Sequence, residues 1–121
     1  MQFLPAAPEL LGAIATLLED KVLGAVPPEL QHQVRVAAHL SRLLEREARL
    51  GPDAWGRERE LIADLLGVDP DDVADPAAAL EERLRAGADP DFEARAWDVL
   101  VDVTRADLAI CKPGHDSWEG V

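Results

Sequence analysis

Proline and glycine divide this chain into segments of a dozen to two dozen residues, and this spacing most limits what the chain can fold into. Between the dividing residues, Ala and Leu dominate the apolar content, and both favour helices. In the first segment Leu10, Ile14 and Leu17 recur at the three- and four-residue spacing of one helix face. No segment alternates apolar and polar residues over a strand's length. The sequence therefore predicts an all-α protein.

The helix boundaries follow from capping residues. Asp before Pro is a typical helix start, and Gly after an apolar run is a typical helix end. We expect a compact bundle of about five helices in one domain, residues 1–121, built mainly on the first, second and fifth helices and ending in a short tail, residues 112–121. The five segments run from about Pro8 to Leu23, Pro28 to Leu50, Asp53 to Leu66, Pro76 to Ala86 and Pro90 to Cys111, and Gly51-Pro52 is expected to end the second helix.

Charge and composition exclude several classes of function. The chain has 121 residues and a formal net charge of −12, so it would repel nucleic acids and anionic membranes. Its single cysteine excludes an internal disulfide, and we expect that residue, Cys111, to be a small buried apolar group. The absence of an apolar span or a basic leader predicts a cytoplasmic protein. Asp69, Asp71, Asp72 and Asp75 lack the spacing of a calcium loop, so we expect neither metal nor cofactor.

One basic row stands out on this acidic chain. Arg35, Arg42, Arg46 and Arg49 fall on one side of the second helix, opposite its apolar arc, and His39 flanks them. The row either faces water or pairs with acids of the same chain, or it binds an anion such as a carboxylate or phosphate. An acidic helix is the favoured occupant, including the chain's own fifth helix through Asp98 and Asp102.

Two acidic residues lie at positions that the pattern assigns to apolar faces. Glu47 lies in the apolar arc of the second helix, and Asp107 lies near Leu100 and Val103 on the fifth. We expect both to be buried and paired with a cation or a backbone donor. The fifth helix is apolar around most of its circumference, so it is expected to be the centre of the bundle or part of an oligomer interface that includes Trp97.

Three blocks resemble a small bacterial all-helical family of unknown function. They are Pro8–Ile14, then Val34–Leu40 continuing through Arg46–Pro52, and finally Ala106–Asp116; His39 departs from the family's usual Asn. The resemblance implies a gene encoded beside an aminoglycoside-phosphotransferase-like kinase and an acyl-CoA dehydrogenase. It implies no catalytic residues.

Three functions remain open on these grounds. The first is a non-catalytic accessory or interaction protein, with the kinase-like protein, another protein or a second copy as its partner. The second is a module that binds a small anion or a CoA-type ligand through Arg35, His39, Arg42 and Arg46. The third is an enzyme that uses Glu47 together with an Arg or His, and it is ranked last because no recognisable catalytic motif accompanies Glu47.

Overall fold

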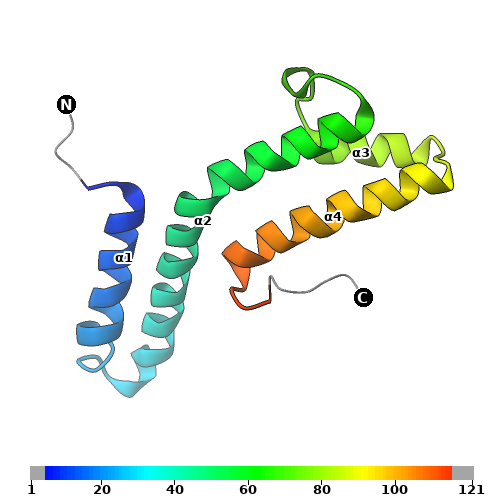
Figure 1. Cartoon of the computed structure of the whole chain (residues 1–121). Coiled ribbons are helices and arrows are strands. Elements are labelled where there is room, and N and C mark those ends of the chain that lie inside the picture. Colours follow the sequence, from blue (N-terminus) through cyan, green and yellow to red (C-terminus); the bar gives the residue numbers. More distant parts are fainter. Residues whose placement is uncertain (1–4, 116–121) are drawn as a thin grey trace. The chain divides into compact units, whose positions relative to one another are not determined.

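The computed structural model describes residues 5–115, and within that range it contains helices and no strand, which confirms the all-α prediction (Figure 1). Four α-helices and two shorter helical segments are present among these residues. They are α1 (Ala7–Leu17), the π-helical segment Leu18–Val22, α2 (Pro28–Leu66), the 3₁₀ turn Pro70–Asp72, α3 (Pro76–Arg85) and α4 (Pro90–Cys111).

The expected break at Gly51-Pro52 is wrong. Helix α2 continues through both residues to Leu66, so the predicted second and third helices are one element of 39 residues. Proline lacks the N–H for one helical hydrogen bond, and its ring crowds both the N–H and the Cβ of the residue before it. Gly51 has no Cβ, so the helical conformation is accessible there. The number of α-helices is therefore four within the described range, against about five expected.

The chain divides at this same point into two compact units, residues 1–51 and residues 52–121. We call them unit 1 and unit 2. The single-domain assignment stays a prediction, as does the part of the predicted tail beyond His115, which lies outside the described residues. The boundary falls where Pro52 removes a backbone hydrogen bond from the helix.

Unit 1 is a helical hairpin of α1, the π-helical segment and the first part of α2. Thr16 contacts Arg42, whereas the earlier Gly12 lies beside Glu45, so the two helices run antiparallel, as Figure 1 also shows. A Cβ at Gly12 would be 3.2 Å from Glu45 Oε1, so glycine allows this close approach. The buried apolar residues of this hairpin are Ala15 and Ala38, which are small.

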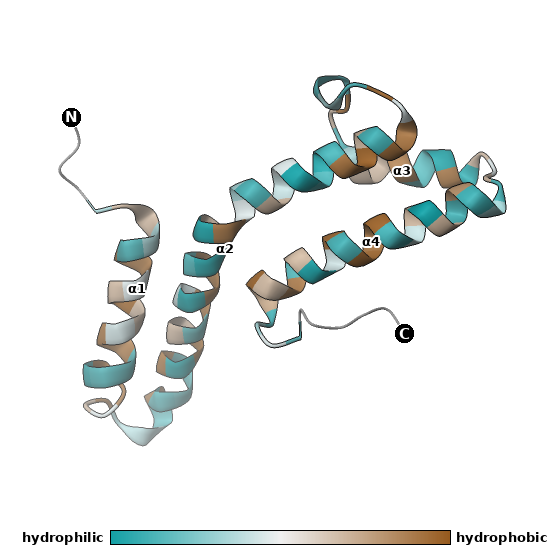
Figure 2. Cartoon of the chain, in the orientation of Figure 1, coloured by the Kyte–Doolittle hydropathy of each residue, from teal (hydrophilic) through white to brown (hydrophobic). Residues whose placement is uncertain are grey.

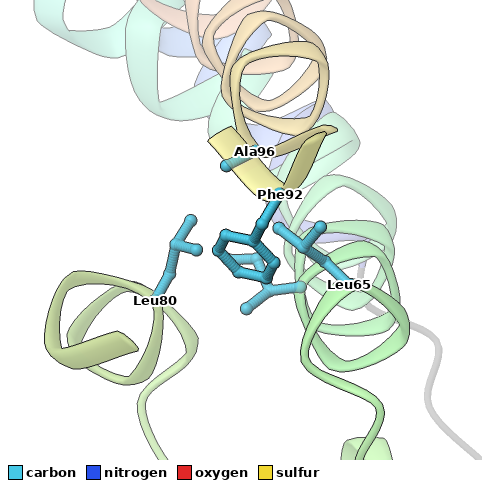
Figure 3. Packing of buried hydrophobic residues seen from close by; sticks show 5 residues of the cluster. Leu65, Leu80, Phe92 and Ala96 are labelled. Atoms are coloured by element: carbon cyan, nitrogen blue, oxygen red, sulfur yellow. The ribbon is translucent and has the colours of Figure 1, made fainter. Parts of the chain in front are cut away.

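Unit 2 has a core of larger side chains. Ile62 and Leu65 of α2, Leu80 of α3, and Phe92 and Ala96 of α4 form one buried cluster. Figure 3 shows Phe92 lying between Leu65 and Leu80. The expected core on the first, second and fifth helices is corrected here, since α3 and the second half of α2 supply most of this cluster. The amphipathic pattern identified each apolar face but not which faces would meet.

Aspartates cap the elements of unit 2 as the sequence predicts. The side chains of Asp75 and Asp89 accept hydrogen bonds from the backbone N–H groups of Ala78 and Phe92, at 3.1 and 2.8 Å. Gly67, at the end of α2, has φ +73°, which a side chain would disfavour. In unit 1 the residue before α1 is Ala6, which provides no side-chain cap.

Candidate interaction surface

Arg42 ties the two helices of unit 1 together. Its guanidinium donates hydrogen bonds to Glu19 at 3.2 and 3.3 Å, to Glu45 at 3.3 Å and to Thr16 at 3.2 Å. The bond to Glu19 is the main reason that the pKa of Arg42 is raised above its ordinary value. Arg42 therefore acts as a structural link between α1 and α2, because its donors point at groups of the same chain.

The rest of the arginine row is also placed by the structure. Arg49 pairs with Glu45 at 3.1 Å, one turn earlier on α2. Arg35 and His39 are exposed, and Arg46 is partly exposed and has an interaction within the chain. Asp102, suggested as an acidic partner of the row, pairs with Arg57 at 2.6 Å. Anion binding by the row stays a prediction, although two of its four arginines already have carboxylate partners.

Large apolar side chains are exposed on both helices of unit 1. We define the apolar face as Leu10, Ile14 and Leu17 of α1 together with Leu30, Leu40 and Leu44 of α2, whose exposed fractions lie between 41% and 52%. Figure 2 shows apolar and polar residues alternating along these helices, as expected for helices with two different sides. Exposed apolar patches mark sites of interaction more often than single scattered apolar residues do.

The two halves of this face lie on the outer sides of the hairpin. Thr16 and Arg42 contact each other where the two helices meet. Ile14 lies about 160° around α1 from Thr16, and Leu40 and Leu44 lie about 160° around α2 from Arg42, so each half points away from the other helix. The hairpin therefore has polar contacts at Arg42 between its helices and exposed apolar residues on the outer side of each helix.

The expected burial of Asp107 is wrong, and Glu47 is only partly buried. Asp107 is exposed, and no polar or charged residue of range 5–115 is buried. Glu47 does lie in the predicted apolar arc, but the neighbouring Leu40 and Leu44 are themselves about half exposed. Nothing forces Glu47 out of water, because its arc is not a core. Cys111, expected to be buried, is exposed as well.

The fifth predicted helix, α4, has a buried side and an exposed side. Phe92, Ala96 and Ile110 are buried, as the main apolar stripe predicts. Trp97, on the second stripe, has 54% of its surface exposed, while Val101 and Leu108 are partly buried. A role for α4 in an oligomer interface stays a prediction, and the exposed Trp97 side chain is available for such a contact.

Unit 2 also has an open groove that the sequence did not reveal. It has a volume of about 370 Å³ and is lined by Ile62, Leu80, Leu84, Leu100 and Val103, with Glu58, Ala77, Glu81 and Arg85 completing the lining. Burial, and then the charges of Asp107 and Asp75, raise the pKa of the Glu58 carboxyl. The groove has the size and apolar lining of a ligand pocket, or of a cleft for one apolar side chain.

Two aspartates of the acidic segment 69–75 accept hydrogen bonds from nearby backbone N–H groups. Asp69 accepts a hydrogen bond from the N–H of Asp71 at 2.9 Å, and Asp75 caps α3. Between residues 5 and 115, no three His, Cys, Asp or Glu residues are grouped to hold a metal ion. Likewise, no helix in the described part of the chain combines the length and apolarity needed to cross a membrane.

Comparisons with known proteins place these features in a family. The searches of curated proteins and of solved structures gave no match to this chain. Residues 24–115 match the family described as "Domain of unknown function (DUF6285)", a match that includes all of α2, α3 and α4. The expected resemblance to an uncharacterised family is confirmed, and the chain belongs to the DUF6285 family.

Proposed function

We propose that this protein is a non-catalytic accessory protein that acts by binding another protein through the apolar face of unit 1. The exposure of that face carries the proposal. Six large apolar side chains of α1 and α2 are each 41–52% exposed, while the buried apolar residues described in the same unit are two alanines. Such a hairpin gains little from its own packing, and covering the face removes apolar surface from water.

The polar contacts of unit 1 support the same function. The bonds of Arg42 to Glu19 and Thr16 hold α1 against α2, and its bond to Glu45 orients the guanidinium. The hairpin can therefore hold the exposed apolar residues of each helix in fixed positions for a partner. The family resemblance adds an expected setting for the partner, near a phosphotransferase-like kinase and acyl-CoA metabolism.

Site-specific photo-cross-linking in cells tests this proposal. A photoreactive amino acid at Leu40 lies on the apolar face, and the same group at the adjacent exposed His39 lies about 100° away around the helix and serves as the matched control. We expect protein adducts from position 40 well above those from position 39, with the cross-linked protein identified by mass spectrometry. Equal yields at both positions would contradict the proposal.

A further inference from the structure

We infer that the groove of unit 2 binds a small amphipathic cation, whose apolar body lies in the groove and whose protonated amine pairs with the carboxylate of Glu58. This inference goes beyond the proposed function, because it concerns a small molecule and unit 2, whereas the apolar face belongs to unit 1. The family description assigns no ligand to the chain.

The walls of the groove are apolar and come from three helices. Ile62 of α2, Leu80 and Leu84 of α3, and Leu100 and Val103 of α4 line a volume of about 370 Å³. Ile62 and Leu80 are buried, whereas Leu100 has 41% of its surface exposed, so the groove deepens from the surface toward the core of unit 2. Its volume lies at the lower end of the range for ligand pockets, about 300–1,000 Å³. The apolar body of a small ligand would remove the exposed part of these side chains from water.

Glu58 supplies the polar contact of this site. It lies one turn before Ile62 on α2, is partly buried and lines the groove. Its carboxylate belongs to none of the ion pairs described in unit 2, which include Arg57–Asp102 and Arg95–Asp91. A charge that is partly removed from water interacts with an opposite charge more strongly than a fully solvated one does. An ammonium group beside Glu58 would therefore be bound by both the charge and the hydrogen-bonding capacity of this carboxylate.

The charges around the groove favour a cation over an anion. The charges of Asp107 on α4 and of Asp75 at the start of α3 both act on the Glu58 carboxyl and add to the rise in its pKa. Arg85, the cation among the lining residues, pairs with Glu81 at 2.5 Å, so this pair adds little net charge. A field of this sign attracts an ammonium ion and repels a carboxylate or phosphate.

Three probes that share one apolar body test the inference on the full-length purified chain. They are 4-phenylbutylamine, 4-phenylbutanol and 4-phenylbutyrate, which carry a cation, a neutral hydroxyl and an anion. Isothermal titration calorimetry should show that the amine binds about fivefold more tightly than the alcohol and that the carboxylate binds more weakly than either. Methyl NMR should show shifts at Ile62, Leu84 and Val103 on addition of the amine.

Substitutions separate the ion pair from the general attraction of an acidic chain. Glu58→Gln keeps the size of the side chain and should weaken the amine about fivefold, to the affinity of the alcohol. Glu60→Gln makes the same charge change at an exposed residue outside the groove lining and should leave the amine within about twofold. Ala77→Phe fills the groove and should weaken both the amine and the alcohol. Circular dichroism establishes that each variant keeps its helices.

Three outcomes would overturn the inference. One is equal affinity for the amine and the alcohol, or no binding of the amine. Another is an equal loss of amine affinity in Glu58→Gln and Glu60→Gln, which would assign binding to the net charge of −12. The third is a set of methyl shifts that lies outside the groove. None of these outcomes affects the proposed function, because cross-linking at position 40 tests unit 1.

Discussion

The two units of this chain are built from the same kind of helix but differ in what their packing buries. Unit 2 encloses Ile62, Leu65, Leu80 and Phe92 between three helices. Unit 1 encloses Ala15 and Ala38 between two, and its larger apolar residues stay half exposed. Amphipathic helices alone therefore do not make a core, because a hairpin has only one inner side and a third helix is needed to cover another.

The helix ends show the same contrast. Asp75 and Asp89 cap α3 and α4 with side-chain hydrogen bonds, whereas α1 begins after Ala6 without one. The cation of Arg83 lies 4.3 Å from the centre of the Phe92 ring, which adds a further contact inside unit 2. Unit 2 is stabilised by its apolar core, by its capped helices and by the Arg83–Phe92 contact. Unit 1 relies on the hydrogen bonds of Arg42 and leaves its large apolar residues exposed.

The largest expected effect comes from truncating the core of unit 2. Ile62 has 2% of its surface exposed, so Ile62→Ala should lower the free energy of unfolding by about 3 kcal/mol through lost burial and the cavity left behind. Urea unfolding followed by circular dichroism measures this loss. The loss should not depend on protein concentration.

Ile14→Ala is the matched substitution in unit 1, since Ile14 is 48% exposed. It should cost less than about 1 kcal/mol, because this side chain is already about half in water. Equal losses in the free energy of unfolding for the two isoleucine substitutions would contradict the difference in packing between the two units.

The boundary between the units offers the next largest effect. Pro52 lies inside α2, and Pro52→Ala restores an N–H that can bond to the carbonyl of Ala48. A helix-interior proline costs about 3 kcal/mol, of which up to ~1 kcal/mol is offset in the unfolded chain. We expect a gain in stability of about 2–3 kcal/mol and slower amide hydrogen exchange around residues 48–56. Unchanged hydrogen exchange at these residues would show that Pro52 does not weaken the helix around it.

Substitutions at the helix caps should have opposite effects on stability in the two units. Asp89→Ala removes the bond to the N–H of Phe92 and should destabilise the chain by about 1 kcal/mol, whereas Ala6→Asp supplies the missing cap of α1 and should stabilise it by about 0.5 kcal/mol. Thermal unfolding of both variants beside the wild type measures the two shifts. The interpretation fails if Ala6→Asp destabilises the chain while α1 stays helical.

The smallest expected effect is the pH dependence at Glu58. Burial raises the pKa of its carboxyl in the folded chain, so the folded state holds this proton more tightly than the unfolded state. Stability from this group is therefore lost as the pH rises through the carboxyl range. Glu58→Gln should stabilise the protein by about 0.5 kcal/mol at pH 7 and by less at pH 4. A gain that is the same at both pH values would contradict this assignment.

Local signals in the sequence predicted the helices well, and tertiary contacts decided the rest. Asp75-Pro76 and Asp89-Pro90 mark helix starts because capping is a contact within four residues. The break expected at Gly51-Pro52 did not occur, because one missing hydrogen bond is outweighed by the helix on both sides. Glu47 was placed on the correct face, but its burial depended on whether another element covered that face, which periodicity alone does not contain.

The position of the core in the chain has a consequence for the order of folding. The cluster that stabilises unit 2 spans Ile62 to Ala96, so its contacts close short loops, which favours rapid folding. During synthesis, however, unit 1 leaves the ribosome first, and the core is complete only after Phe92 and Ala96 have been added. At about 5–20 residues per second, the leucines of α1 and α2 are exposed for several seconds before any core exists. The nascent hairpin is thus the part of this protein most in need of a chaperone.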